Sequence, residues 1–270
     1  MNEKPSKSPL LDSKKYDESS VFDPDALLKE ARRQKELSKE AVPDVCVLDP
    51  DGDIVDYLVE TGRAERFESW PGYHTDMYVF EHEGREYGVV GRAVGAPFAV
   101  LVAEQLFVSG CELLVSVTSA GRIVERDDPP YFVLVDSALR DEGTSLHYAL
   151  PSRYAEADMR LVSSVEKACR DASPTVYIGA TWTTDAPFRE TETAIERARS
   201  EGVLAVEMEA SALYSLASVR EEDIICFAHV TNEMGRVDKD FEKGEKSGSV
   251  AALEVIAAAS EGWSSTTSEG

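Results

Sequence analysis

The sequence has little cysteine and no long apolar run, and each shortage excludes a class of protein. Four cysteines lie far apart in 270 residues, without a Cys-x-x-Cys pair or a Cys/His spacing typical of zinc sites. They are expected to be buried thiols in a reducing compartment. No segment is long and apolar enough to span a bilayer, and the N-terminus lacks the apolar core of a signal peptide. We therefore expect a cytoplasmic protein without a metal centre.

Basic residues are also scarce. The sequence has 28 Lys and Arg against 51 Asp and Glu, which gives a net charge of −23. Such a charge repels phosphate backbones, so nucleic acids and anionic membranes are poor partners. A small anionic substrate would need a local basic pocket. The hydrophobic content of 43% is ordinary for a globular protein and is enough to build a core.

Short apolar runs alternate with helical patterns along most of the chain. This alternation predicts one three-layer αβα domain around a mixed, largely parallel twisted sheet. The domain is expected over residues 23–262, with a helix at 23–37 as an added arm. Residues 1–22 and 263–270 are polar and are expected to be flexible tails. Strands are expected at residues 45–48, 113–121, 132–139, 175–182, 203–209 and 224–232, with a hairpin at 77–91 and a closing helix at 247–261.

Ligands of such sheets bind at the carboxyl ends of the strands, which here are residues 118–121, 206–211 and 229–233. In the second segment, Glu207 and Glu209 stand where an apolar strand becomes an apolar helix. Burying a carboxylate there costs several kcal/mol, as an order of magnitude, unless it is paired or binds a ligand. This segment is therefore the most informative of the three.

Two interpretations of this segment are open. A carboxylate can accept two hydrogen bonds from a vicinal diol, and the thioether of Met208 offers a polarisable contact for a sugar. Alternatively, one glutamate binds the N-terminus of the following helix, where the helix dipole favours negative charge. The two interpretations are balanced for Glu207, whereas a functional role is favoured for Glu209.

Four segments, in the same order, resemble the nucleoside phosphorylase superfamily. The resemblance covers about residues 44–260. It implies the family's α/β fold and cleavage of the bond between a ribose and a nucleobase. AVEMEASALYSLA (205–217) is similar to the VEMEA segment of the ribose site, LRDEGTSLHYALPSRYAEAD (139–158) to the Ser-Leu-His-Phe stretch of uridine phosphorylases, GATWTTDAPFRETE (179–192) to the base-binding loop, and VGAP (94–97) to the Ile-Gly-Gly-Pro turn.

The resemblance assigns the ribose to the 207–209 segment. It implies that Glu209 binds the 2′- and 3′-hydroxyls and acts in catalysis, with Met208 against the sugar and Glu207 ordering the same pocket. The reaction of the family has an oxocarbenium-like transition state. Glu209 suits this reaction because its hydrogen bonds to the ribose strengthen as positive charge develops.

The resemblance also implies a base site. Phe188 would lie against the base with Arg189 as a polar contact, although Phe188 is equally explained as a core or lid aromatic. Asn232 stands where purine-acting relatives often carry an acidic proton donor. An amide can hydrogen-bond the base but cannot give up a proton at neutral pH, and Asn is also common in turns. His147 has a family counterpart, but a structural histidine is at least as well supported.

The phosphate site departs from the family pattern. Ser116 stands at the place of the family's phosphate-binding arginine, and the turn at residues 49–53 keeps Gly52 but has three aspartates and no arginine. Those carboxylates would repel phosphate. The candidates for a phosphate or water site are Gly52, Arg92, Thr118 and Ser119, with Arg122 as a further arginine; either arginine is equally explained as a surface residue.

Three functions therefore stay open. The first is a phosphorylase that uses phosphate as co-substrate and forms ribose 1-phosphate and a free base. The second is a nucleosidase that uses water, with Asp51 or Asp53 as the base. The third is a catalytically weak protein that binds a nucleoside. The breadth of the resemblance favours the phosphorylase, and it implies a homo-oligomer, a dimer or a hexamer, that needs no metal or organic cofactor.

Overall fold

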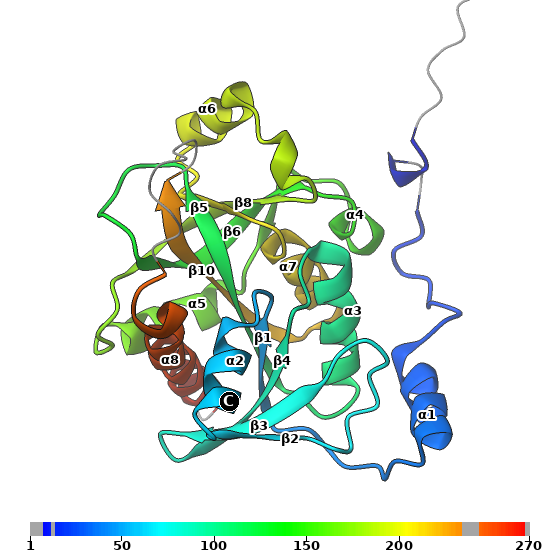
Figure 1. Cartoon of the computed structure of the whole chain (residues 1–270). Coiled ribbons are helices and arrows are strands. Elements are labelled where there is room, and N and C mark those ends of the chain that lie inside the picture. The colour runs from blue at the N-terminus through cyan, green and yellow to red at the C-terminus, as the bar shows by residue number, and fades with distance from the viewer. Residues whose placement is uncertain (1–7, 12–13, 234–242, 268–270) are drawn as a thin grey trace, which may run out of the picture.

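The computed structural model describes residues 8–11, 14–233 and 243–267, except for the side chains of residues 232 and 233. It contains one large sheet with helices on both faces (Figure 1). The strands are β1 (Val45–Asp49), β2 (Ala64–Arg66), β3 (Met77–His82), β4 (Arg85–Gly91), β5 (Leu113–Arg122), β6 (Tyr131–Asp141), β7 (Tyr154–Glu156), β8 (Val176–Thr184), β9 (Ala205–Glu207) and β10 (Asp223–Glu233). The helices are α1 (Pro24–Lys35), α2 (Asp53–Glu60), α3 (Ala96–Phe107), α4 (Ser145–Tyr148), α5 (Met159–Cys169), α6 (Glu192–Ser200), α7 (Ala210–Arg220) and α8 (Ser249–Thr267), with short 3₁₀ turns η1 (Pro9–Leu11), η2 (Pro187–Arg189) and η3 (Glu245–Gly248).

The strand order in the sheet is β10-β6-β8-β9-β5-β1-β4-β3-β2, and β7 pairs with β6. Strand β10 also pairs with β5, so β5, β9, β8, β6 and β10 form a closed ring of pairings. The predicted α/β fold with a mixed sheet is confirmed. The long pairings of β5 with β10 and of β6 with β8 are parallel, whereas β2–β3, β3–β4, β6–β7, β5–β9 and β6–β10 are antiparallel.

The helices form two layers. Helix α8 packs against α2 and α5 on one face of the sheet, and α7 packs against α3 and α4 on the other (Figure 1). Strand β1 is buried along its whole length, as expected for the run VCVL, because helices cover both of its faces. Helix α2 buries only its apolar side, Ile54, Val55 and Leu58. Between these layers, β1 and β5 pair in parallel, so their carboxyl ends lie side by side.

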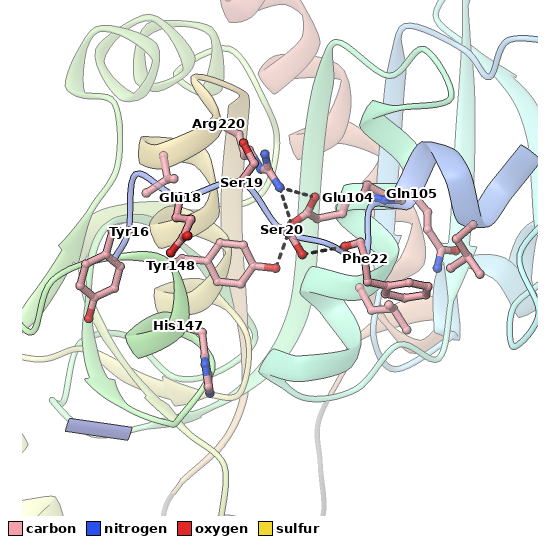
Figure 2. Close-up of a pocket in the computed structure, with 14 residues that line it drawn as sticks. Tyr16, Glu18, Ser19, Ser20, Phe22, Glu104, Gln105, His147, Tyr148 and Arg220 are labelled. Carbon is pink, nitrogen blue, oxygen red and sulfur yellow. Dashed lines mark hydrogen bonds and ion pairs between the residues drawn. The ribbon is translucent and has the colours of Figure 1, made fainter. Parts of the chain in front are cut away.

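The N-terminal segment lies on the outer side of α3. Leu28 and Ala31 of α1 are fully buried, in keeping with a helix that packs as an arm. Residues 14–23 form no helix or strand. They border a cavity of about 370 Å³ whose other walls come from α1, α3, α4 and α7. Figure 2 shows Tyr148 and Arg220 directed at Glu104 in this cavity.

The C-terminal boundary differs from the prediction. Helix α8 continues to Thr267, and Trp263 is buried with its Nε1 donating to the Asp223 carboxylate at 2.8 Å. The predicted tail from residue 263 therefore begins too early. Ser264 and Ser265 lie within this helix, and their hydroxyls donate to the carbonyls four residues before them. The short elements β2, β7 and α4 lie below the length that periodicity can detect.

Candidate active site

The junction between β9 and α7 holds both glutamates of the VEMEA segment. β9 ends at Glu207, α7 begins at Ala210, and both carboxylates are buried. Glu207 Oε1 accepts hydrogen bonds from the hydroxyls of Thr181 at 3.1 Å and Thr183 at 2.5 Å. Its Oε2 accepts from the backbone N–H groups of Glu209 at 2.6 Å and Ala210 at 2.7 Å.

A carboxylate has about four acceptor sites, so these donors use the whole capacity of Glu207. Two of the donors are N–H groups of the first turn of α7, which a helix cannot satisfy internally. Burial raises the pKa of Glu207, and the donors oppose that shift because they favour the charged form. Glu207 thus binds the N-terminus of α7, as the structural interpretation of this residue predicts, and shapes the pocket only indirectly.

Glu209, by contrast, has hydrogen-bond acceptor sites that the chain does not use. Its Oε1 accepts from Gly95 N at 2.7 Å, and its Oε2 accepts from Thr118 Oγ1 at 2.9 Å and Met208 N at 3.3 Å. One acceptor site remains, and the Thr118 hydroxyl can rotate to free a second. Burial, with the nearby charge of Glu207, raises the pKa of Glu209 to about 8. This arrangement suits a diol that brings its own donors.

The conformation of Gly95 explains why the VGAP turn has a glycine at this position. Its φ of 87° is accessible to glycine without strain, and this conformation aims its N–H at Glu209 just before α3 begins. Met208 is half-buried beside the same carboxylate. The structure therefore brings together three segments that the sequence separates, namely the VGAP turn, Thr118 in β5 and the VEMEA junction.

The aspartates at the end of β1 lie next to this group. Asp49 is buried, and its carboxylate accepts from the backbone N–H groups of Gly52 at 3.0 Å and Val55 at 3.0 Å. Burial raises the pKa of Asp49 to about 7. Asp51 is exposed, and its Oδ2 accepts from Ser119 N at 2.8 Å. A carboxylate of the chain thus accepts the backbone N–H of Ser119, a candidate residue of the phosphate or water site.

The nearby cations are likewise paired. Arg92 has a φ of 66°, and its guanidinium lies over Gly52 and donates to both Asp56 carboxylate oxygens at 2.6 and 2.7 Å. Lys243 forms an ion pair with Asp53. Sequence reasoning missed Lys243, because it reaches α2 from 190 positions away and belongs to no motif. Each of these cations is neutralised by an aspartate of α2.

His229 is a second residue that sequence reasoning missed. It lies opposite Ser119 in the β5–β10 pairing and is 5% exposed. Its ring stacks on Phe132 with centroids 4.4 Å apart. Together with Asp51 and Ser119 it borders a small cavity of about 20 Å³. No group of three or more His, Cys, Asp or Glu side chains suited to a metal is found among the described residues.

Other predicted residues lie apart from this group. Phe188 in η2 is 100% exposed, and Arg189 beside it is exposed too. His147 is exposed on α4, bonds to Lys14 Nζ at 2.8 Å, and borders the cavity of Figure 2. Asn232 pairs with Gly121 in β10, but its side chain lies outside the described residues.

The predicted strand at 113–121 is confirmed and extends by one residue, to Arg122. Residues 118–121 pair with β10, and Arg122 pairs with Ala205 of β9. The register explains this, because β9 and β10 supply partners on both sides that a periodicity argument cannot see. Arg122 is buried and donates to the carbonyl of Asp127 at 2.9 Å.

Comparisons with known proteins identify the family of this chain. The family model described as the phosphorylase superfamily matches residues 44–261. A uridine phosphorylase of Thermococcus kodakarensis is 25% identical over 234 residues, which are 76% of this chain and 82% of the relative. A DeoD-type purine nucleoside phosphorylase of Hahella chejuensis is 30% identical over 145 residues, which are 52% of this chain and 61% of the relative.

The fold likeness is equally broad. A crystal structure of uridine phosphorylase from Vibrio fischeri superposes with a TM-score of 0.68 at 21% identity, covering 84% of this chain and 93% of that one. The α/β fold is therefore that of the uridine phosphorylase structure. The chain belongs to the phosphorylase superfamily. No helix in the described part of the chain has the length and apolarity needed to cross a membrane.

Proposed function

We propose that this protein cleaves the N-glycosidic bond of a nucleoside, with the ribose bound at Glu209. The observation that carries the proposal is the difference between the two buried glutamates. Glu207 has all its acceptor capacity filled by the chain, whereas Glu209 is held by Gly95 and Thr118 with acceptor capacity left over. A buried carboxylate with spare acceptor sites is suited to a ligand that carries adjacent hydroxyl groups.

Water is the nucleophile that the geometry supports best. Three carboxylates lie at the end of β1, and one of them already accepts the Ser119 N–H. A phosphate dianion would meet these charges at short range, whereas water carries no charge. Asp51 is exposed and close enough for its charge to raise the pKa of Glu209 further. It is therefore our candidate for the general base.

The reaction balances as a hydrolysis. The bond between C1′ and the base nitrogen breaks, and the base leaves with the electron pair. The water oxygen bonds to C1′ while Asp51 takes its proton. Glu209 stabilises the positive charge that develops on the ribose. The base takes up a proton from solvent, with Asn232 as the proposed hydrogen-bonding contact to the base, and the products are free ribose and the base.

Phosphorolysis is the second candidate, and the names of the relatives favour it. Both relatives described above are phosphorylases by name. In that reaction phosphate replaces water and the sugar product is ribose 1-phosphate. The cations Arg92 and Lys243 would have to leave Asp56 and Asp53 to bind it. Phe188 and Arg189 remain the proposed base contacts in either reaction, in a homo-oligomer in which a second copy covers them.

The test is base release from a panel of purine and pyrimidine nucleosides, with and without phosphate. Equal rates in the two buffers support hydrolysis. Release that requires phosphate supports the phosphorylase. Tight nucleoside binding without base release from any substrate contradicts both reactions and supports a binding protein.

A further inference from the structure

His229 combines three properties that the reaction described above does not use. It is 5% exposed, its Nε2 has no hydrogen-bond partner among the described residues, and it borders the cavity of about 20 Å³. A buried polar atom without a hydrogen-bond partner is destabilising, so such atoms are rare unless a bound molecule supplies the partner. This makes the cavity a candidate site for a small polar molecule.

The surroundings of the ring fix its orientation. Phe132 stacks on one face of the ring, with an angle of 9° between the two planes. Gly248 closes against the ring edge, because a Cβ at that glycine would lie 2.2 Å from His229 Cε1. Gly248 belongs to η3, where Lys246 and Ser247 also have positive φ angles of 52° and 56°. Positive φ angles are unfavourable for Lys246 and Ser247, and in this conformation of the turn Gly248 lies in contact with the imidazole.

Burial of the ring keeps the imidazole neutral. Burial lowers the pKa of His229 to about 4, and the positive charge of Lys243 contributes, while Asp51 and Asp53 act in the opposite direction. A neutral imidazole has one donor and one acceptor nitrogen. A molecule bound in this cavity must therefore be small, uncharged and able to form hydrogen bonds with both a ring nitrogen and a carboxylate.

We propose that this cavity holds one water molecule that forms hydrogen bonds with both His229 Nε2 and the Asp51 carboxylate. This water holds the Asp51 carboxylate in the position in which it accepts the hydrogen bond from Ser119 N. A volume of about 20 Å³ is sufficient for a single water, and the lining groups supply the polar partners such a water needs. Only the Oδ2 atom of Asp51 is engaged by Ser119, so Oδ1 can accept from the water. His229 is then a positioning residue for the base of the reaction, and this role rests on the hydrolysis proposed above.

The kinetic test compares two matched variants of β10. His229→Phe keeps a ring against Phe132 but removes both nitrogens. Thr231→Val removes another buried polar atom without a partner among the described residues, two positions further along the strand and outside the cavity. We expect His229→Phe to lower kcat by on the order of 10- to 100-fold with KM unchanged, because a misplaced base slows the chemical step and not nucleoside binding. Thr231→Val should keep the wild-type kcat.

Two further readouts separate a positioning role from a structural one. The Ser119 amide should exchange its hydrogen faster in His229→Phe than in the wild type, because Asp51 is less firmly held. His229→Gln, which can still bond to the water, should recover part of the kcat. Wild-type kcat and wild-type Ser119 exchange in His229→Phe would overturn the proposal, as would equal losses in His229→Phe and Thr231→Val.

A crystal structure decides the water itself and does not depend on activity. Density for one water within hydrogen-bond distance of His229 Nε2 and Asp51 is expected, and a well-ordered but empty cavity would contradict the proposal. A wild-type protein that releases no base would contradict the proposed function alone. In that case the density and the Ser119 exchange still decide whether His229 holds Asp51 through water.

Discussion

The β9–α7 junction and the β1–α2 turn both place carboxylates at strand ends, but they use them differently. At the junction, Glu207 satisfies the helix N-terminus and so leaves Glu209 with capacity for a ligand. At the turn, Asp51 takes up the Ser119 N–H, and the neighbouring cations pair with Asp53 and Asp56. In the proposed function the first region binds the sugar, whereas in the second region the chain's own charged groups are paired with one another.

The strongest test of the first region is Glu209→Gln. We expect turnover to fall by on the order of 10²–10³, since the amide cannot supply the negative charge that stabilises the ribose cation. Steady-state base release measures the effect. Urea unfolding should show little change in the free energy of unfolding, because a carboxyl with a pKa of about 8 is mostly protonated at pH 7. Turnover close to wild type would remove Glu209 from the mechanism.

The strongest test of the second region is Asp51→Asn. If Asp51 is the general base, base release should fall about 10²-fold, the lower end of what general bases contribute. Asp56→Asn is the matched control, because it makes the same change in an exposed aspartate of α2. Equal rates for the two variants would argue that Asp51 takes no part in proton transfer.

The pH dependence of kcat/KM tests which charge state of Glu209 is active. Burial raises the pKa of Glu209 to about 8, so this group is protonated below that pH and charged above it. We expect kcat/KM to rise about tenfold per pH unit below pH 8 and to level off above it. Glu209→Gln should lack this rise. A profile that falls as the pH increases through 8 would mean that the protonated form of Glu209 is the active one.

Glu207→Gln tests the structural side of the comparison. The amide faces four donors and cannot accept from all of them, so we expect a loss of about 2–4 kcal/mol in the free energy of unfolding. Urea unfolding measures this loss. The folded fraction should lose less activity than Glu209→Gln does. The opposite ranking in both measurements would exchange the roles of the two residues.

The smallest effect is expected for Phe188→Ala. Its side chain is fully exposed, so stability should change by less than about 0.5 kcal/mol. If Phe188 contacts the base, KM should rise by several-fold while kcat changes little. An unchanged KM for every nucleoside in the panel would remove it from the base site.

The proposed sugar site has a clearer signal in the sequence than the proposed nucleophile site, and the reason is physical. Glu207, Met208 and Glu209 are neighbours in one segment, so a local pattern carries their shared role. The partners of Glu209, Gly95 and Thr118, stand 114 and 91 positions away, and only the sheet brings them together. Local periodicity still located every long strand, because each is an apolar run between turns.

The nucleophile site had no comparable local signal. Lys243 and His229 reach it from the C-terminal third of the chain, and neither stands in a motif. Arg92 is a plausible phosphate ligand by position, and only its contact with Asp56 shows that it is already paired. The acidic 49–53 turn was the one visible sign, and it predicted repulsion of phosphate without predicting the contact between Asp51 and Ser119.

The most direct test of the central claim is the source of the oxygen on C1 of the released sugar. Base release in ¹⁸O-enriched water, with phosphate present, is followed by mass spectrometry of the sugar product. The account predicts free ribose that carries solvent oxygen at C1, because the chain's own carboxylates have taken the anion site. Ribose 1-phosphate whose C1 oxygen comes from unlabelled phosphate would contradict it.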